Sequence, residues 1–247
     1  MAGLRDLVRL AYLKPYFQLE AMPVQAQYGP MIVFMIAPLF LWLFIRFPAP
    51  YLFSQSLLLD ELKAYILMFG AMQTSILTGF VSSFLILEEK DENIFSGINV
   101  LPVPLHWFLI IRVTFFTMLA GIFSFIILRF NGWMNLETSE ALLLGFEYSL
   151  IAPFIVMVIT TFAANKVEGI AYFKAIDLLL ILPMLSFLVK SQLMWLAGII
   201  PTFWLFRQTD AVIHQENPYF FFLALLISLG LIFSFLTRRF IAKTFNS

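Results

Sequence analysis

The sequence predicts an all-α integral membrane protein with a single transmembrane domain over residues 1–247. Hydrophobic residues make up 62% of the chain and charged residues only 12%, and the mean hydropathy is +0.93. A soluble domain carries about 25% charged residues. The apolar residues are also gathered into runs near the ~20 residues that a bilayer requires. These runs leave no room for a sizeable soluble domain, and the net charge of zero gives no electrostatic basis for binding nucleic acid.

Residues 1–27 predict an interfacial segment that lies on membrane lipids. Apolar residues recur there at the spacing of one helical face, with basic residues on the other face. The apolar face consists of Leu4, Leu7, Val8, Ala11 and Tyr12, and the basic residues are Arg5, Arg9 and Lys14. Pro15 is expected to end this amphipathic helix. Because charges interrupt the first fifteen residues, we expect no signal peptide here.

Six apolar runs predict transmembrane helices. They cover approximately residues 31–47, 62–87, 106–128, 141–163, 175–189 and 218–236. The stretch between the fifth and sixth runs, residues 190–217, is apolar but is interrupted by Gly198 and Pro201. A short, broken apolar stretch of this kind favours an external re-entrant hairpin over a complete span.

The distribution of Lys and Arg predicts the orientation of the chain. With six spans both termini lie on one side of the membrane. Ten Lys and Arg residues fall on that side and five on the other. Cytoplasmic segments carry the excess of Lys and Arg. We therefore expect a multi-pass protein of the plasma (inner) membrane with both termini in the cytoplasm.

The segment 88–105, between the second and third spans, is the most charged part of the chain. It opens with four carboxylates, which cannot enter the bilayer core: Glu88, Glu89, Asp91 and Glu92. An apolar stripe at helical spacing follows around Gly97, and its members are Ile94, Phe95, Ile98 and Leu101. We expect a short helix with the carboxylates at its positive end. It could be a solvated loop, lie on the membrane surface, or dock into a groove of a soluble partner. The apolar stripe favours docking, since a solvated loop does not need an apolar face.

The sequence contains no motif that predicts catalysis or a cofactor. Cysteine is absent, and the two histidines, His106 and His214, lie far apart. No Gly-Lys pair occurs, so the chain cannot bind ATP through a P-loop of its own. The acidic cluster could bind Mg²⁺, but no second set of carboxylates converges on it. We therefore expect no catalytic residue, no metal site and no cofactor bound by this chain.

Within the spans, two features are candidate functional sites. The second span carries small residues at every fourth position, which allow a neighbouring helix to approach closely. This stripe consists of Gly70, Thr74, Thr78 and Ser82, and it could be a substrate path, a dimer seam or simple packing within the chain. Glu147 in the fourth span is the other candidate, because a carboxylate at that depth is costly. Arg129 could neutralise Glu147, and Asp177 could pair locally with Lys174.

These features together resemble the permease subunits of ABC transporters of the type-2 export class. The resemblance rests on the interfacial helix, the six spans, the broken apolar stretch before the last span, and Glu88, Glu89, Gly97, Leu101 and Pro102 in the acidic segment. The stretch from Asn165 to Gly169, together with Lys174, is similar to permeases of fluoroquinolone exporters. The resemblance covers nearly the whole chain.

The resemblance implies a transport subunit rather than an enzyme. The helix within 88–105 would be a coupling helix that docks on a separate ABC ATPase, which would carry the ATP and Mg²⁺. The residues implied in coupling are Glu88, Glu89, Asp91, Glu92, Ile94, Phe95, Gly97, Ile98 and Leu101. A second permease, identical or related, would complete the unit, and the substrate would be a small amphiphilic or hydrophobic molecule. The alternative is a stand-alone polytopic membrane enzyme or assembly factor with an acidic cytoplasmic loop.

Overall fold

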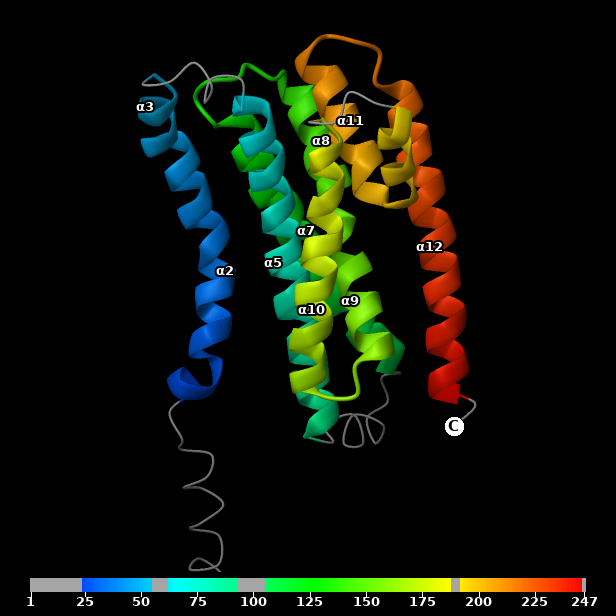
Figure 1. Ribbon diagram of the computed structural model, residues 1–247. Coiled ribbons are helices and arrows are strands. Elements are labelled where there is room, and N and C mark those ends of the chain that lie inside the picture. The colour runs from blue at the N-terminus through cyan, green and yellow to red at the C-terminus, as the bar shows by residue number, and fades with distance from the viewer. Residues whose placement is uncertain (1–23, 55–61, 93–104, 188–191, 246–247) are drawn as a thin grey trace, which may run out of the picture.

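The computed structural model describes residues 24–54, 62–92, 105–187 and 192–245, which form an elongated helical bundle (Figure 1). The α-helices are α2 (Val24–Arg46), α3 (Pro48–Ser54), α5 (Lys63–Asp91), α7 (Leu105–Arg129), α8 (Thr138–Ser149), α9 (Ile151–Phe162), α10 (Lys166–Ile181), α11 (Pro201–Ile213) and α12 (Tyr219–Phe245). Two 3₁₀ helices, η1 (Leu182–Phe187) and η2 (Gln192–Ile199), precede α11. No strand occurs in the described ranges, and the all-α prediction is confirmed.

Six helical stretches of the described chain are long and apolar enough to cross a membrane, as predicted. They are Ile32–Ser54, Lys63–Asp91, Leu109–Arg129, Thr138–Phe162, Lys166–Phe187 and Tyr219–Arg238. The fifth differs most from its prediction, because it begins at Lys166 rather than near residue 175. Residues 166–174 include charged side chains and therefore lie outside the predicted span, but they form the first turns of α10. The side chain of Asn165 caps this helix by accepting a hydrogen bond from the backbone N–H of Glu168.

The boundaries of the predicted non-spanning segments also shift. Residues 24–27 belong to the start of α2, and the predicted interfacial helix before them lies outside the described residues. In the segment 88–105, Glu88–Asp91 form the last turn of α5 and Leu105 begins α7. The end of α5, the beginning of α10 and the C-terminus all lie at the same end of the bundle (Figure 1).

Helix α5 is the centre of the bundle. Of its most apolar 18-residue window 72% is buried, against 17% for the first span and 17% for the last. It packs against α2, α7, α9 and α10. A helix in this position needs a surface that several neighbours can approach, and small residues provide it. Its small and hydroxyl residues are accordingly buried, including Gly70, Thr74, Ser75, Thr78, Gly79, Ser82 and Ser83.

Gly79 marks the closest approach between α5 and α9. A Cβ atom at Gly79 would lie 2.8 Å from the carbonyl oxygen of Ala152 and 3.0 Å from its Cα atom. Both are backbone atoms, which cannot rotate away as a side chain can. On the opposite flank, a Cβ atom at Gly70 would meet the side chain of Ile45 on α2. Glycine at position 79 therefore sets how near α9 lies to α5, whereas the Ile45 side chain could adjust to a Cβ at position 70.

The fourth span is a single apolar stretch with a break in its middle. Helix α8 ends at Ser149 and α9 begins at Ile151, with the N–H of Leu150 donating to the carbonyl of Glu147 at 3.1 Å. Pro153 has no backbone N–H and cannot donate to the carbonyl one turn earlier. The proline therefore explains why the helix is interrupted here.

The stretch before the last span folds as η2 and α11, and the break between them lies at Ile200, within the Gly198–Pro201 region that was expected to interrupt the stretch. Trp204 Nε1 donates to the carbonyl of Gly198 at 2.8 Å, and Thr202 Oγ1 donates to the carbonyl of Leu180 at 2.7 Å. These bonds hold the two pieces together and attach α11 to α10. Whether the stretch enters the membrane as a re-entrant hairpin stays a prediction.

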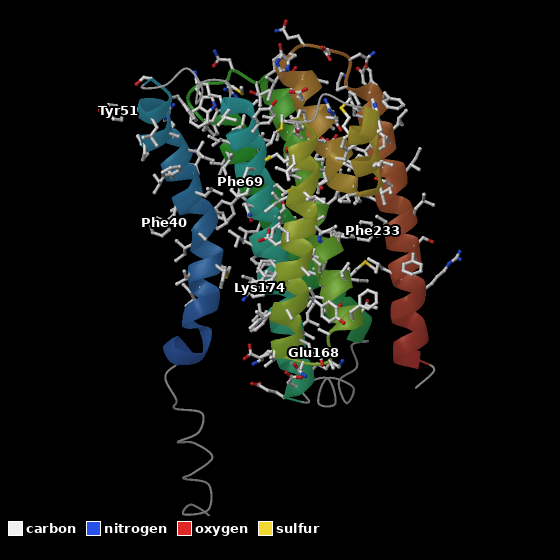
Figure 2. All side chains as sticks on the ribbon, viewed as in Figure 1. Phe40, Tyr51, Phe69, Glu168, Lys174 and Phe233 are labelled. Carbon is white, nitrogen blue, oxygen red and sulfur yellow. The ribbon has the colours of Figure 1, made fainter. Side chains whose placement is uncertain are left out.

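The outer faces of the bundle are apolar, as lipid contact requires. On the α2–α3 arm, Phe40 and Tyr51 point away from the other helices (Figure 2), and their exposed fractions are 65% and 68%. In a soluble protein such a surface would be a large exposed patch. The hydrocarbon core of a bilayer provides the medium in which these side chains are solvated.

Replacing Gly79 with Ala should destabilise the protein. The added Cβ would meet the backbone of Ala152, and overpacking of this kind costs about 1–3 kcal/mol. The gain of about 1 kcal/mol in helix propensity does not offset it. The measurement is the thermal unfolding midpoint of the purified protein in detergent. Gly230→Ala is the control, because nothing lies within 4 Å of a Cβ there. An equal or higher midpoint for Gly79→Ala would contradict the described α5–α9 packing.

Candidate functional site

The acidic residues expected to begin a short docking helix instead end α5. Glu88, Glu89 and Asp91 lie in its last turn, where the helix dipole is negative and carboxylates are unfavourable. The expectation that they occupy the positive end of a following helix was therefore wrong for these three residues. The reason is that α5 continues beyond the end of the apolar run, so the charged residues form its last turn.

Two basic residues from other helices offset this concentration of negative charge. The Nζ atom of Lys166 on α10 lies 2.5 Å from Glu88 Oε1, and Arg112 on α7 forms an ion pair with Glu89. The backbone N–H of Lys166 also donates to Asp91 Oδ2 at 3.4 Å. Glu88 is only 4% exposed, so its charge is held inside the protein rather than offered to solvent. These contacts tie α5, α7 and α10 together, and we call them the charged clamp.

The stretch from Asn165 to Gly169 builds the α10 side of the clamp. Asn165 Oδ1 accepts from the N–H of Glu168 at 3.0 Å, and Glu168 Oε2 accepts from the N–H of Ala164 at 2.8 Å. The first bond caps an N–H group in the first turn of the helix, and the second fixes the residue that precedes the cap. A Cβ at Gly169 would lie 2.6 Å from the side chain of Leu87, so glycine allows α10 to approach α5. Figure 2 labels Glu168 at this end of the bundle.

The apolar stripe predicted to dock on a partner lies outside the described residues. This applies to Ile94, Phe95, Gly97, Ile98 and Leu101, and their role in coupling stays a prediction. Glu92 is the last described residue before them, and it is exposed. The charged clamp therefore lies at the end of α5, directly before residues 93–104. Arg112 extends the clamp to α7, the helix that follows these residues.

The small-residue stripe of α5 is covered by the chain's own helices. Thr74 Oγ1 lies 2.6 Å from Ser124 Oγ on α7, and Thr78 Oγ1 donates to the carbonyl of Thr74 at 2.8 Å. Gly70, Thr74, Thr78 and Ser82 are all buried. These contacts support packing within the chain, and a role as substrate path or dimer seam stays a prediction.

Glu147 is completely buried, and its partner is Gln208 on α11. Gln208 Nε2 donates to Glu147 Oε1 at 2.9 Å, and neither residue has any exposed surface. Arg129, considered as a partner from the sequence, instead donates to Thr138 Oγ1 at 3.3 Å. Asp177 likewise accepts from Gln73 on α5 at 3.5 Å, while Lys174 is exposed.

An apolar groove of about 730 Å³ runs along α7, α8 and α9. It is lined by Val113, Thr114, Thr117, Met118, Gly121, Ile122, Phe125, Leu142, Phe146, Ser149 and Pro153. Three hydroxyl side chains are the polar members of this lining. The groove can therefore accept a molecule that is mostly apolar and makes a few hydrogen bonds.

Sequence reasoning missed the partners rather than the sites. Lys166 and Arg112 are among the ten Lys and Arg residues that the sequence places on the same side of the membrane as the acidic segment, so a search for opposite charges on that side could have found the clamp. Gln208 lies in the short polar run Arg207–Asp210 within a mostly apolar region, and this run could have been searched for a partner of Glu147.

Comparison with known proteins places the chain in one family. The sequence model of the fluoroquinolones export permease protein Rv2686c-like family matches residues 25–237. Two relatives from Mycobacterium tuberculosis, the fluoroquinolones export permease proteins Rv2686c (strain H37Rv) and MT2760 (strain CDC 1551), are each 25% identical to it over 138 residues. These residues are 55% of this chain and 55% of each relative, so the chain spans about half the length of the curated relatives it matches. No solved structure matches the chain.

The family match extends over most of the sequence and includes all six candidate spans except the last residue of the sixth. The chain therefore belongs to the fluoroquinolones export permease Rv2686c-like family.

Proposed function

We propose that this chain is the membrane-spanning permease subunit of an ATP-driven ABC exporter. A separate ATPase subunit would hydrolyse the ATP, and the export of an amphiphilic or hydrophobic substrate would be driven through residues 88–105. Family membership supports an export permease. The sequence contains no P-loop, which agrees with ATP hydrolysis by a separate subunit.

The charged clamp is the observation that carries this proposal. Residues 93–104 connect α5 to α7, and the clamp joins the end of α5 both to α7 and to α10. A force applied to the connection would therefore reach three helices together rather than one. This is the arrangement that a transporter requires if ATP hydrolysis outside the membrane is to rearrange helices within it.

The substrate class follows from the surface that the helices offer. The groove along α7, α8 and α9 is apolar with Thr114, Thr117 and Ser149 as hydrogen-bonding groups. An amphiphilic or hydrophobic molecule suits this lining better than a multiply charged one, which would be left without partners. We expect the working unit to contain a second permease, identical or related, as the resemblance to type-2 exporters implies.

The alternative, a stand-alone membrane enzyme or assembly factor, has less support. It uses the acidic segment as a site or a scaffold, but Glu88 pairs with Lys166, Glu89 pairs with Arg112, and Asp91 accepts from the backbone N–H of Lys166. A carboxylate already paired with a cation is poorly placed to bind Mg²⁺. In the clamp these residues join three helices, which is a role that suits a transport subunit.

The first test concerns docking. Phe95→Asp should weaken capture of the ATPase by roughly two orders of magnitude, since burial of a phenylalanine contributes about 1.5–3 kcal/mol and the charge adds a further penalty. The measurement is pull-down of the ATPase at matched membrane levels of permease. Phe95→Leu is the control, because it keeps an apolar side chain. If Phe95→Asp captures the ATPase as well as wild type, the stripe does not dock.

The second test separates coupling from docking. Lys166→Met removes the ammonium from Glu88, which should cost about 1–3 kcal/mol of stability, while leaving the apolar stripe untouched. We expect normal capture of the ATPase but less substrate transported per ATP hydrolysed in proteoliposomes. Lys174→Met is the matched control, because Lys174 is an exposed lysine on the same helix. Equal coupling in the two variants would exclude the clamp as a transmitting element.

The third test concerns orientation, and the absence of cysteine from the chain gives it a blank background. Cysteine introduced at exposed Lys90, at the end of α5, should be shielded from a membrane-impermeant thiol reagent in intact cells. Cysteine at exposed Ser139, near the start of α8 at the opposite end of the bundle, should react. Permeabilised cells provide the control in which both react. Labelling of position 90 from outside would refute the cytoplasmic placement of the acidic segment.

A further inference from the structure

The contact between Glu147 on α8 and Gln208 on α11 leaves two acceptors unsatisfied. Gln208 Nε2 donates to Glu147 Oε1 at 2.9 Å, but Glu147 Oε2 and Gln208 Oε1 have no hydrogen-bond partner among the described residues. Both side chains are 0% exposed. Buried polar atoms without a partner are rare in native proteins, and two in one contact require a physical explanation.

No cation neutralises this carboxylate in the described part of the chain. Beside Gln208 on α11, Arg207 stacks at 4.4 Å on the ring of Phe187, while Asp210 pairs with His214. Next to Glu147 on α8, the hydroxyl of Tyr148 lies 3.1 Å from that of Thr209. The charged groups of α7 are engaged elsewhere, Arg129 with Thr138 and Arg112 with Glu89. On α5, Lys63 lies over Phe53, the acidic residues are in the clamp, and Lys90 is exposed at the far end of the helix. Helix α9 has no charged residue.

We propose that Glu147 is a proton-binding site and that its protonated form joins α8 to α11. A proton on Oε2 would allow Glu147 to donate to Gln208 Oε1 while Oε1 accepts from Gln208 Nε2. A carboxylic acid and a carboxamide then form a closed pair with two hydrogen bonds, and one proton satisfies both of the remaining oxygens. The opposite orientation of the Gln208 amide would place its oxygen against Glu147 Oε1 and would require the same proton.

Loss of the proton would change the contact between the helices. The ionised carboxylate would keep one hydrogen bond, but Gln208 Oε1 would be left without a donor, and no cation among the described residues would compensate the buried charge. An uncompensated charge at such a position is strongly unfavourable. The proton therefore helps to keep α11 in place against α8, next to the neighbouring bond between Tyr148 and Thr209.

Infrared spectroscopy of the purified protein in lipid nanodiscs at neutral pH tests this proposal. Wild type minus Glu147→Gln should contain a carbonyl band of a protonated carboxylic acid, and this band should shift in D₂O. Wild type minus Glu140→Gln is the control, because the Glu140 carboxylate caps α8 by accepting from the N–H of Glu137. Apart from the amide bands of the introduced glutamine, that difference should contain carboxylate bands and no acid carbonyl band. If Glu147→Gln removes carboxylate bands instead of an acid band, the proposal is overturned.

Thermal stability gives a second, independent outcome. Glu147→Gln is neutral and can form the same closed pair through its amide, so its unfolding midpoint should stay close to that of wild type. Glu147→Ala removes one member of the pair and should lower the midpoint clearly. If Glu147→Gln unfolds as early as Glu147→Ala, or fails to fold, a negative charge is required at this position and the proton-binding site is excluded. Neither result depends on the ATPase or on transport.

Discussion

The close packing around α5 is the constraint on which the rest of the structure depends. Between membrane helices there is little hydrophobic driving force, because lipid is as apolar as the side chains. Association must come from close contact and from hydrogen bonds between helices. Gly79 brings the backbone of α9 next to α5, and the Ser124 hydroxyl of α7 bonds to Thr74 and to the carbonyl of Ala71. The helices that pack directly on α5 are therefore held in place by these close contacts.

The sequence predicted the parts of the fold that depend on polarity. Runs of apolar residues revealed all six spans, and Gly198 with Pro201 revealed the broken stretch before the last one. The start of the fifth span was missed because Lys166 and Glu168 have the composition of a loop. A charged residue can belong to a membrane helix when it is used for a cap or an ion pair at the end of that helix, and such use depends on a partner distant in sequence.

For the candidate sites, the sequence identified the unusual residues but not their partners, which lie far away in the sequence. That Glu88, Glu89 and Glu147 are unusual could be recognised from the sequence, since carboxylates are costly in or near lipid. Their partners could not, because the structure brings them together across large separations: 78 residues for Glu88 and Lys166, and 61 for Glu147 and Gln208. Periodicity and spacing describe neighbours within a helix and contain no information on which helix lies opposite.

The helices differ in how many specific contacts fix their positions, and this difference indicates where the bundle can rearrange. Helices α5, α7 and α9 meet through backbone approach and buried hydroxyl bonds, which tolerate little displacement. Helix α10 is attached to α5 by the charged clamp at one end, where Gly169 approaches Leu87, and by the ring contact between Phe80 and Phe173 and the bond between Gln73 and Asp177 further along. Helix α11 is attached to α8 through Glu147 and Tyr148. A few polar contacts can be exchanged at lower cost than a packed helix interface. If the chain is the permease subunit proposed above, movement is expected at α10 and α11, around a core of α5, α7 and α9 that stays intact.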